Sequence, residues 1–499
     1  MKALRGKTGR WGFCSAGLML VAIVLLISAG GRAEPLDSPK AEEDAKPASN
    51  AEDDLLDVAD KKNETEKSPA DIGFELLVTR PYVNPEFSDA EFDELWKVWE
   101  EPARSEAEKA TPEERRELTL LRYGLQHRPQ GTPGGEAQAG MPIQYLRRDD
   151  GEWVVNCFAC HGGKVAGRVI PGLPNSHFAM QTLWADVRTS RFAKDEYTLK
   201  DLAGGFLPMG GSNGTTNAVA FGVLLGSRRD IHADLDMDRP LPKLLHHDVE
   251  APPWWNVKKK KWLYADGFVS SDNHRSLIQF AMGPENSGAK LRGWDKDYQF
   301  IMAYIKSLEA PEYPFEVDAE LAAEGEQYFN NTCAECHGTY GENETYPNRH
   351  VPIEEIGTDR ARFDSLTPEY RQAFQESWFA DYGRSPVVTE PVGYMAPPLD
   401  GIWASAPYFH NGSVPTLWHV LNVNERPTVW KRTEDGYDTD RIGLEVAEFD
   451  NLPEGIYDLR VRRTYFDTTQ FSKSAAGHDF PEQLTHEQKL AVLEYLKTL

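Results

Sequence analysis

Two short motifs carry the clearest chemical signal in this 499-residue sequence. Each consists of two cysteines separated by two residues and a histidine directly after the second cysteine. Their residues are Cys157, Cys160 and His161, and Cys333, Cys336 and His337. In C-x-x-C-H both thiols can bond to one porphyrin, and the adjacent histidine can then bind its iron. The sequence therefore predicts two covalently bound haem c groups, with one histidine of each motif as an iron ligand.

Paired cysteines have other uses in proteins. The two pairs could together form a four-cysteine zinc site, and either pair could be a redox dithiol or a disulfide. None of these uses explains a histidine directly after both pairs, whereas haem attachment requires it. Haem c is therefore the preferred interpretation.

The segments that would position these motifs are mostly helical in pattern. Apolar residues recur at helical spacing in "SDAEFDELWKVWEEPA" and "TPEERRELTLLRYGL", which Ser88 and Thr111 would cap. The segment "DAELAAEGEQYF" leads into the second motif, and the helical segments "FIMAYIKSL" and "LAVLEYLKTL" end at Leu308 and Leu499. Alternation typical of strands is scarce, although "KKKKWLYADGF" predicts a short ribbon. The expected fold class is mainly α, with two cytochrome c-like haem domains in tandem preceded by a disordered acidic tether.

The repeated order of motif, loops and closing helix predicts the domain boundaries. We expect a signal peptide or anchor at 1–33, a disordered acidic linker at 34–72, an N-terminal haem c domain at 73–310 and a C-terminal cytochrome c domain at 311–499. The acidic linker has too few apolar residues to bury a core. Prolines in "EAPEYPFEVD" mark the connection between the two domains.

The first residues and the charge balance bear on location and partners. A basic head precedes an apolar run at 17–29, and Gly31 and Ala33 are small residues of the kind that a signal peptidase reads. We therefore expect export to the periplasm, with a retained membrane tether as the alternative because residues 11–31 carry no charge. The formal net charge of -25 argues against nucleic acid and suits basic protein partners.

The second half of the chain resembles a known superfamily. The stretch "LDGIWASAPYFHNGSVPTL" at 399–417, together with two C-x-x-C-H motifs, resembles the bacterial di-haem cytochrome c peroxidases and their relatives. The ending "YFDTTQFSKSAAGHDFPEQLTHEQKLAVLEYLKTL" is most similar to the rubber-oxygenase branch. The resemblance extends over about 317–499, covers only scattered positions between 165 and 300, and is lost before 140.

This resemblance implies a haem oxidoreductase. The leading expected reaction is reduction of hydrogen peroxide with electrons from a small c-type cytochrome or a cupredoxin. One alternative is a haem-dependent oxygenase that cleaves an apolar substrate, and another is a cytochrome that only transfers electrons. The peroxidases also bind calcium between domains, but no acidic loop identifies such a site, and the sequence does not indicate an oligomeric state.

Three residues compete as the second ligand of the haem at His337. The resemblance favours His478, because it matches a histidine of a bis-histidine haem in the rubber-oxygenase branch. Met395 follows in rank, in a proline-rich context typical of a ligand methionine. His410 is third, and the resemblance places it beside the haem and its propionates, with Trp403 and Tyr408 of the same segment nearby. Asn424 stands where the peroxidases have their ligand methionine, which is a departure from their pattern.

For the haem at His161, the resemblance implies His177 as a displaceable distal residue, with an exposed loop histidine as the alternative. Met209 is a weaker candidate. In the peroxidases a Gln and a Glu flank a Gly-Pro pair, so the resemblance implies that Gln279 and Glu285 move a proton between peroxide oxygens. Their spacing departs from that of the family, and a surface glutamate is the simpler explanation of Glu285. The segment "WWNVKKKKWLY" could relay electrons through its tryptophans or dock a donor through its lysines, or it could be a solvated hairpin.

Overall fold

The computed structural model describes residues 67–499, apart from 205–210, 241, 243–244 and 246. The predicted signal peptide, most of the predicted acidic linker and Met209 lie outside the described residues. Within the part that is described, no helix has the length and apolar character needed to cross a membrane.

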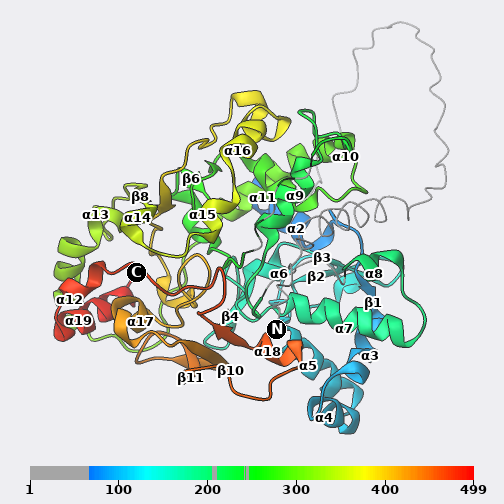
Figure 1. Ribbon diagram of the computed structural model, residues 1–499, viewed down its shortest axis with the longest axis horizontal. Helices are drawn as coiled ribbons and strands as arrows, with labels where there is room; N and C mark the ends of the chain where they lie inside the picture. The colour runs from blue at the N-terminus through cyan, green and yellow to red at the C-terminus, as the bar shows by residue number, and fades with distance from the viewer. Residues whose placement is uncertain (1–66, 205–210, 241, 243–244, 246) are drawn as a thin grey trace, which may run out of the picture.

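Helices and short strands alternate along the described chain (Figure 1). The longer α-helices are α2 (Pro69–Thr79), α5 (Pro112–Tyr123), α7 (Met180–Ala193), α9 (Ala218–Ser227), α11 (Asp295–Ser307), α12 (Ala319–Thr332), α16 (Pro368–Gln375) and α19 (His486–Leu496). The shorter ones are α3 (Asp89–Glu94), α4 (Ala103–Lys109), α6 (Phe158–His161), α8 (Leu199–Gly204), α10 (Gly288–Gly293), α13 (Ala334–His337), α14 (Ile353–Ile356), α15 (Ala361–Ser365), α17 (Leu417–Leu421) and α18 (Leu459–Arg462). The longer 3-10 segments are η3 (Trp254–Lys258), η4 (His274–Ala281) and η5 (Trp378–Gly383).

The strands form five small sheets among the described residues. They are β1 (Phe87–Ser88), β2 (Tyr145–Arg147), β3 (Glu152–Val155), β4 (Gly162–Val165), β5 (Arg168–Pro171), β6 (Trp262–Leu263), β7 (Val269–Ser270), β8 (His350–Pro352), β9 (Gly393–Met395), β10 (Val429–Asp438), β11 (Gly443–Phe449) and β12 (Tyr465–Asp467). The two three-stranded sheets have the orders β1-β3-β2 and β11-β10-β12, and the other sheets are two-stranded antiparallel pairs.

The expected fold class, a mainly α chain of two cytochrome c-like haem domains in tandem, is wrong. Helices account for 42% and strands for 14% of the described structure, and the strands are spread over five sheets. Most of these strands have two to four residues, which is too short for the alternation that identifies a strand in sequence. Only β10 and β11 are longer, and both carry charged side chains that hide the pattern.

Two crossed helix pairs nevertheless lie near the cysteine motifs (Figure 1). Helix α2 packs along α11, and α12 packs along α19. A glycine stands at each crossing: a Cβ added at Gly73 would lie 2.0 Å from the Phe300 carbonyl oxygen, and one added at Gly325 would lie 1.9 Å from that of Ala491. Because only glycine permits this approach of two backbones, each crossing is fixed by its sequence.

The predicted helix starts are confirmed. Ser88 caps α3 and Thr111 caps α5, and each forms a reciprocal pair with the residue three positions on. Thr485, which was not predicted, caps α19 in the same way. The ribbon expected in "KKKKWLYADGF" is present as β6 paired with β7. Helix α2 begins at Pro69, shortly before the boundary predicted at 73.

Three groups of buried apolar side chains form the interior. The first motif contributes Phe158 to one group, in which Trp254 is also buried. Trp255 belongs to a different group, with Trp403 and residues of α12 and α19. Two adjacent tryptophans therefore join the interior around the first motif to the interior around the second.

Candidate haem sites

The second motif ends in His337, whose ring is held by a hydrogen bond at Nδ1. Helix α12 leads into α13, whose last residue is His337. Its Nδ1 lies 2.8 Å from the carbonyl oxygen of Pro397. In the tautomer with the hydrogen on Nδ1, this N–H donates a hydrogen bond to Pro397, and Nε2 is left free to bind iron. Burial lowers the pKa of His337, so the ring is neutral at neutral pH, as iron binding requires.

The second imidazole of this site belongs to His478. The ring centroids of His337 and His478 lie 6.2 Å apart, with an angle of 66° between the planes. Burial, and then the neighbouring His337, lower the pKa of His478 to about 3. Two imidazoles that bind one metal ion from opposite sides, with metal–nitrogen bonds of about 2 Å, have centroids roughly 6 Å apart. The spacing therefore fits a haem iron held between the two rings.

The backbone fixes the position of His478. Its φ is 56°, in the left-handed region, and its N–H donates to the carbonyl oxygen of Ile356 at 2.7 Å. Gly477 before it has a φ of 79° and packs directly against Gly357. Arg426 then donates hydrogen bonds to the carbonyl oxygens of Ala475 and Gly477, at 2.6 and 2.8 Å. The loop therefore presents the imidazole to His337 in one orientation.

The first motif lies in a more apolar setting. His161 ends α6, and its ring stacks on Trp254 with centroids 4.5 Å apart and planes 26° apart. Burial lowers the pKa of His161 to about 3, and the Pro252 backbone acts in the opposite direction. Among the described residues, no second imidazole faces His161 as His478 faces His337.

A repeated tripeptide, missed in the sequence prediction, serves both sites. Ala251-Pro252-Pro253 lies beside His161, and Ala396-Pro397-Pro398 lies beside His337. The repeat of Ala-Pro-Pro after each motif is the signal that could have identified these carbonyl groups. The Pro397 carbonyl oxygen orients the ring of His337, whereas the Pro252 backbone lies near His161 without a hydrogen bond to its Nδ1.

The two tripeptide loops also touch one another. The indole N–H of Trp255 donates to the carbonyl oxygen of Asp400 at 2.7 Å, and the side-chain amide of Asn256 donates to that of Pro398 at 2.9 Å. A short path of bonded and hydrogen-bonded groups therefore connects the surroundings of His161 with those of His337.

The other two candidates for the haem at His337 lie elsewhere. Met395 is buried on β9 opposite His350, and its sulfur lies beside Gly267. The ring of His410 packs on Tyr394, with centroids 4.4 Å apart. Burial lowers the pKa of His410 to about 3. The described contacts bring neither residue to His337, so the geometry favours His478 over both.

The two aromatic residues of the same segment serve in packing. The Trp403 indole N–H donates to the Pro311 carbonyl oxygen at 2.9 Å, and its ring contacts Tyr313 and Tyr437. The Tyr408 hydroxyl donates to the carbonyl oxygen of Ile402 at 3.1 Å. Trp403 therefore anchors the connection at 309–318 in this structure.

The residues predicted to act at the first haem come from different segments. The imidazole of His177 is half-buried, and its backbone N–H donates to Oδ1 of Asn175, whose own N–H donates to the Cys160 carbonyl oxygen. Gln279 is buried, packs beside Gly222 of α9, and donates to the Tyr264 hydroxyl. Glu285 is exposed, as expected for the surface glutamate that was the simpler explanation of this residue. A buried peroxide pocket with Gln279 and Glu285 side by side is therefore not formed.

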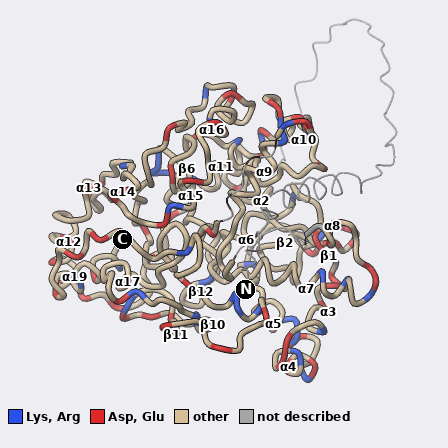
Figure 2. The backbone as a smooth tube through the Cα atoms, viewed as in Figure 1, with Lys and Arg blue, Asp and Glu red and all other residues tan. Residues whose placement is uncertain are grey.

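The lysines of "WWNVKKKKWLY" are partly neutralised within the chain. Lys258 pairs with Glu309, and Lys259 pairs with Glu344 and Asp400 at 2.5 and 2.7 Å. Figure 2 shows basic and acidic residues interspersed along the described chain. This segment therefore offers a weaker basic surface than its composition suggests.

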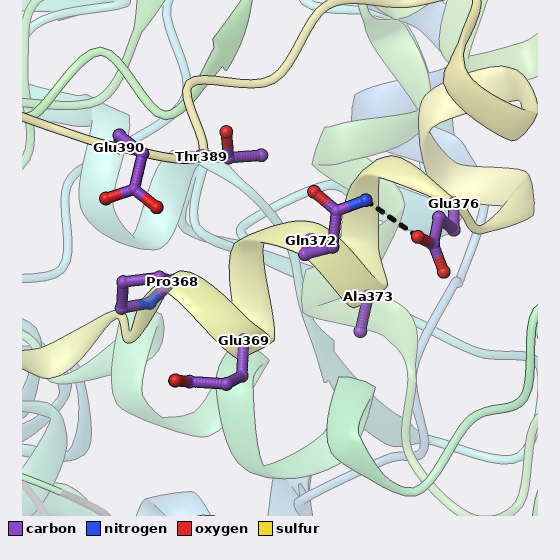
Figure 3. Close-up of a pocket in the computed structure, with 7 residues that line it drawn as sticks. All are labelled: Pro368, Glu369, Gln372, Ala373, Glu376, Thr389 and Glu390. Carbon is purple, nitrogen blue, oxygen red and sulfur yellow. Dashed lines mark hydrogen bonds between the residues drawn. The ribbon is translucent and has the colours of Figure 1, made fainter.

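Two further observations concern other ligands. Across the described residues, no group of three or more His, Cys, Asp or Glu side chains is arranged to hold a metal ion by itself. The four described cysteines are also free of disulfides. A surface hollow on α16 is bordered by Glu369, Glu376 and Glu390 (Figure 3), and none of its residues belongs to the predicted sites.

The comparisons with known proteins can be placed on this geometry. Residues 393–431 match the family described as RoxA-like, cytochrome c-like. The matched range runs from β9 through Pro397 and His410 to the start of β10. A haem-binding cytochrome related to the rubber oxygenases is therefore supported, whereas the match does not extend to the peroxidases.

Two proteins of Sinorhizobium fredii (strain NBRC 101917 / NGR234) are similar over longer ranges. Uncharacterized protein y4iM is 31% identical over 274 residues, which is 50% of this chain and 60% of that protein. Uncharacterized protein y4iJ is 31% identical over 247 residues, which is 37% of this chain and 39% of that protein. This chain thus spans less than two thirds of the length of either relative.

Proposed function

We propose that this chain is a di-haem c oxidoreductase in which the two haems have different roles. The haem at Cys333, Cys336 and His337, with His478 as its second ligand, transfers and stores electrons. The haem at Cys157, Cys160 and His161 is the site where the oxidant reacts. The observation that carries this assignment is the 6.2 Å separation of the His337 and His478 rings, which has no counterpart at His161 among the described residues.

Electron transfer at the His337 haem follows from the ligands. A haem supplies one-electron chemistry, and two nitrogen ligands fill its iron and leave no position for an oxidant. His337 and His478 stay neutral because burial lowers the pKa of each. The Pro397 carbonyl group and the Ile356 carbonyl group hold the two residues in place.

We further propose that the reaction is oxygenation of an apolar substrate by dioxygen. The interior around the first motif groups Phe158 and Trp254 with Val223, Ile278 and Met282. Buried apolar surroundings of this kind keep water away from a group that reacts there. The match of residues 393–431 to a family related to the rubber oxygenases supports the same reaction class. The exposed side chain of Glu285 weakens the peroxidase alternative.

Export to the periplasm remains part of the proposal. It rests on the basic and apolar pattern of the first residues, which lie outside the described part. Haem c attachment outside the cytoplasm is consistent with it. A small c-type cytochrome or cupredoxin is the proposed electron partner.

Isotope labelling tests the reaction. The holoprotein would be incubated with an unsaturated hydrocarbon under ¹⁸O₂, and the products would be analysed by mass spectrometry. Incorporation of ¹⁸O is expected. Peroxide-dependent oxidation of reduced cytochrome c without incorporation would favour a peroxidase instead. Failure of the reduced protein to bind carbon monoxide would show that both irons are saturated and that the chain only transfers electrons.

A further inference from the structure

A buried carboxyl group, that of Glu250, lies beside the first haem motif. Both carboxylate oxygens of Glu250 are buried, and neither has a hydrogen-bond partner among the described residues. A buried acid without a partner is unfavourable, so a functional reason for it is to be sought. Glu250 directly precedes the Ala-Pro-Pro segment that approaches His161.

The position of Glu250 is fixed by backbone on both sides. Val249 and Thr216 exchange two backbone hydrogen bonds, of 2.9 and 3.0 Å. The Glu250 N–H donates to the carbonyl oxygen of His410 at 2.8 Å. A Cβ added at Gly412 would lie 3.0 Å from Oε2 of Glu250, so the glycine leaves room for the carboxyl group.

Two titratable groups face this carboxyl group from other elements. Cys160 of α6 is close enough that Glu250 contributes to raising the pKa of its thiol. Burial raises the pKa of Glu250, and Arg432 of β10, a buried cation, acts in the opposite direction without cancelling it. Arg432 donates to the Ser176 hydroxyl at 3.3 Å rather than forming a close ion pair with Glu250. Once Cys160 is bonded to haem, its sulfur no longer titrates.

Two ionisable groups near Glu250 are already compensated or neutral. Asp248 pairs with Lys473 at 3.3 Å and accepts a hydrogen bond from the Gly211 N–H at 2.7 Å. His410 is neutral at ordinary pH because burial lowers its pKa to about 3. Among these groups, Glu250 is therefore the one whose charge can change near neutral pH beside the first motif.

We propose that Glu250 is the proton-holding group of the haem site at His161. When that haem accepts one electron from an external one-electron donor, the Glu250 carboxylate takes one proton from water and becomes a neutral carboxyl group. When the electron leaves, the O–H bond breaks and the proton returns to water. Arg432 sets the pH at which this exchange occurs. The inference rests on the haem site proposed at His161 and deepens its role, whatever the oxidant.

The physical basis is the low polarity of the surroundings. An electron added to a buried site raises the affinity of a neighbouring carboxylate for a proton, because the two negative charges repel strongly in a poorly screened interior. Proton uptake cancels the added charge. An exchange of one proton per electron lowers the midpoint potential by up to about 59 mV for each tenfold fall in proton concentration.

Redox titration of the full holoprotein tests this coupling. The potential of the His161 haem would be followed by optical and EPR spectroscopy between about pH 5 and 9. In the wild type it is expected to fall as pH rises. In Glu250→Gln, which keeps the shape but cannot titrate, this dependence is expected to disappear. In Glu250→Asp it is expected to persist.

A control and a second variant sharpen the result. Glu136→Gln removes an exposed carboxylate and is expected to leave the pH dependence unchanged. Arg432→Gln is expected to move the dependence to higher pH, because the guanidinium group lowers the pKa of Glu250. Haem content and thermal unfolding check that each variant folds. Infrared difference spectra are expected to show a carboxyl band on reduction that Glu250→Gln lacks.

The outcomes separate this inference from the proposed reaction. A wild-type potential without pH dependence, or a dependence that Glu250→Gln retains, would overturn the role of Glu250. If the dependence is lost in Glu250→Gln but ¹⁸O is not incorporated by the wild type, Glu250 keeps its role and the oxygenase assignment fails. Absence of covalent haem at Cys157 and Cys160 would overturn both.

Discussion

The imidazole rings of His337 and His478 lie 6.2 Å apart, although 141 positions separate them in the sequence. One ring is oriented by the Pro397 carbonyl group and the other by a loop packed on Gly357. Because each ring is held by its own contacts, the distance between the two rings is set by the folded backbone. Variants of the supports should therefore change the haem as clearly as variants of the ligands.

Substitution of Gly477 should displace His478. A Cβ at this position would lie 2.3 Å from the Gly357 carbonyl carbon, and its φ of 79° is unfavourable for alanine. Gly477→Ala is expected to lose about 1–3 kcal/mol of stability and part of the low-spin haem signal, measured by urea unfolding and EPR. Gly455→Ala is the matched control, with a φ of 84° and nothing within 4 Å of the added Cβ. Equal effects of the two substitutions would contradict the packing explanation.

The crossing of α12 and α19 should tolerate no side chain at Gly325. An added Cβ would lie 1.9 Å from the Ala491 carbonyl oxygen, so the helices must move apart. Gly325→Ala is expected to lower the free energy of unfolding by about 1–3 kcal/mol or more. Gly293→Ala, at a helical position with open space around it, is expected to be neutral or slightly stabilising. Thermal and urea unfolding would measure both variants. An unchanged free energy of unfolding in Gly325→Ala would show that α12 and α19 do not approach each other closely at Gly325.

Stability should fall in acid partly through His410. Its pKa is lowered from 6.5 to about 3, first by burial and then by Arg362 and His247. Between these two pH values the unfolded chain binds a proton and the folded chain does not. The contribution of His410 to the free energy of unfolding is therefore fully present above pH 6.5 and is lost as pH falls toward 3. In His410→Gln the slope of the free energy of unfolding against pH in acid is expected to decrease by at most about 1.4 kcal/mol per pH unit. Urea unfolding at several pH values measures it, and an unchanged slope would contradict the burial of a neutral ring.

Residue types and short-range patterns predict part of this molecule well. The C-x-x-C-H motifs and the helix caps depend on neighbours in sequence, so Ser88, Thr111 and the two motif histidines can be found from the sequence alone. His478 required the resemblance to a family, because nothing local links it to His337. The β10–β11 hairpin was missed because its charged residues interrupt the alternation.

The remaining features depend on contacts between distant segments. Glu250 looks like an ordinary surface glutamate in sequence, and only the packing of Thr216, His410 and Gly412 around it reveals a buried acid. The same applies to Trp403, which the resemblance to a family placed beside the haem. Its indole N–H donates to the Pro311 carbonyl oxygen, on the connection between the two halves, a contact that no local pattern indicates.

The EPR spectrum of the oxidised holoprotein, compared with those of His478→Ala and His410→Ala, tests the central assignment most directly. The wild type is expected to show a low-spin signal with two nitrogen ligands from the His337 haem. His478→Ala is expected to keep this haem covalently bound and to lose that signal, because one ligand is gone. His410→Ala is expected to retain it. Loss of the signal in His410→Ala with its retention in His478→Ala would contradict the assignment of His478 as the second ligand.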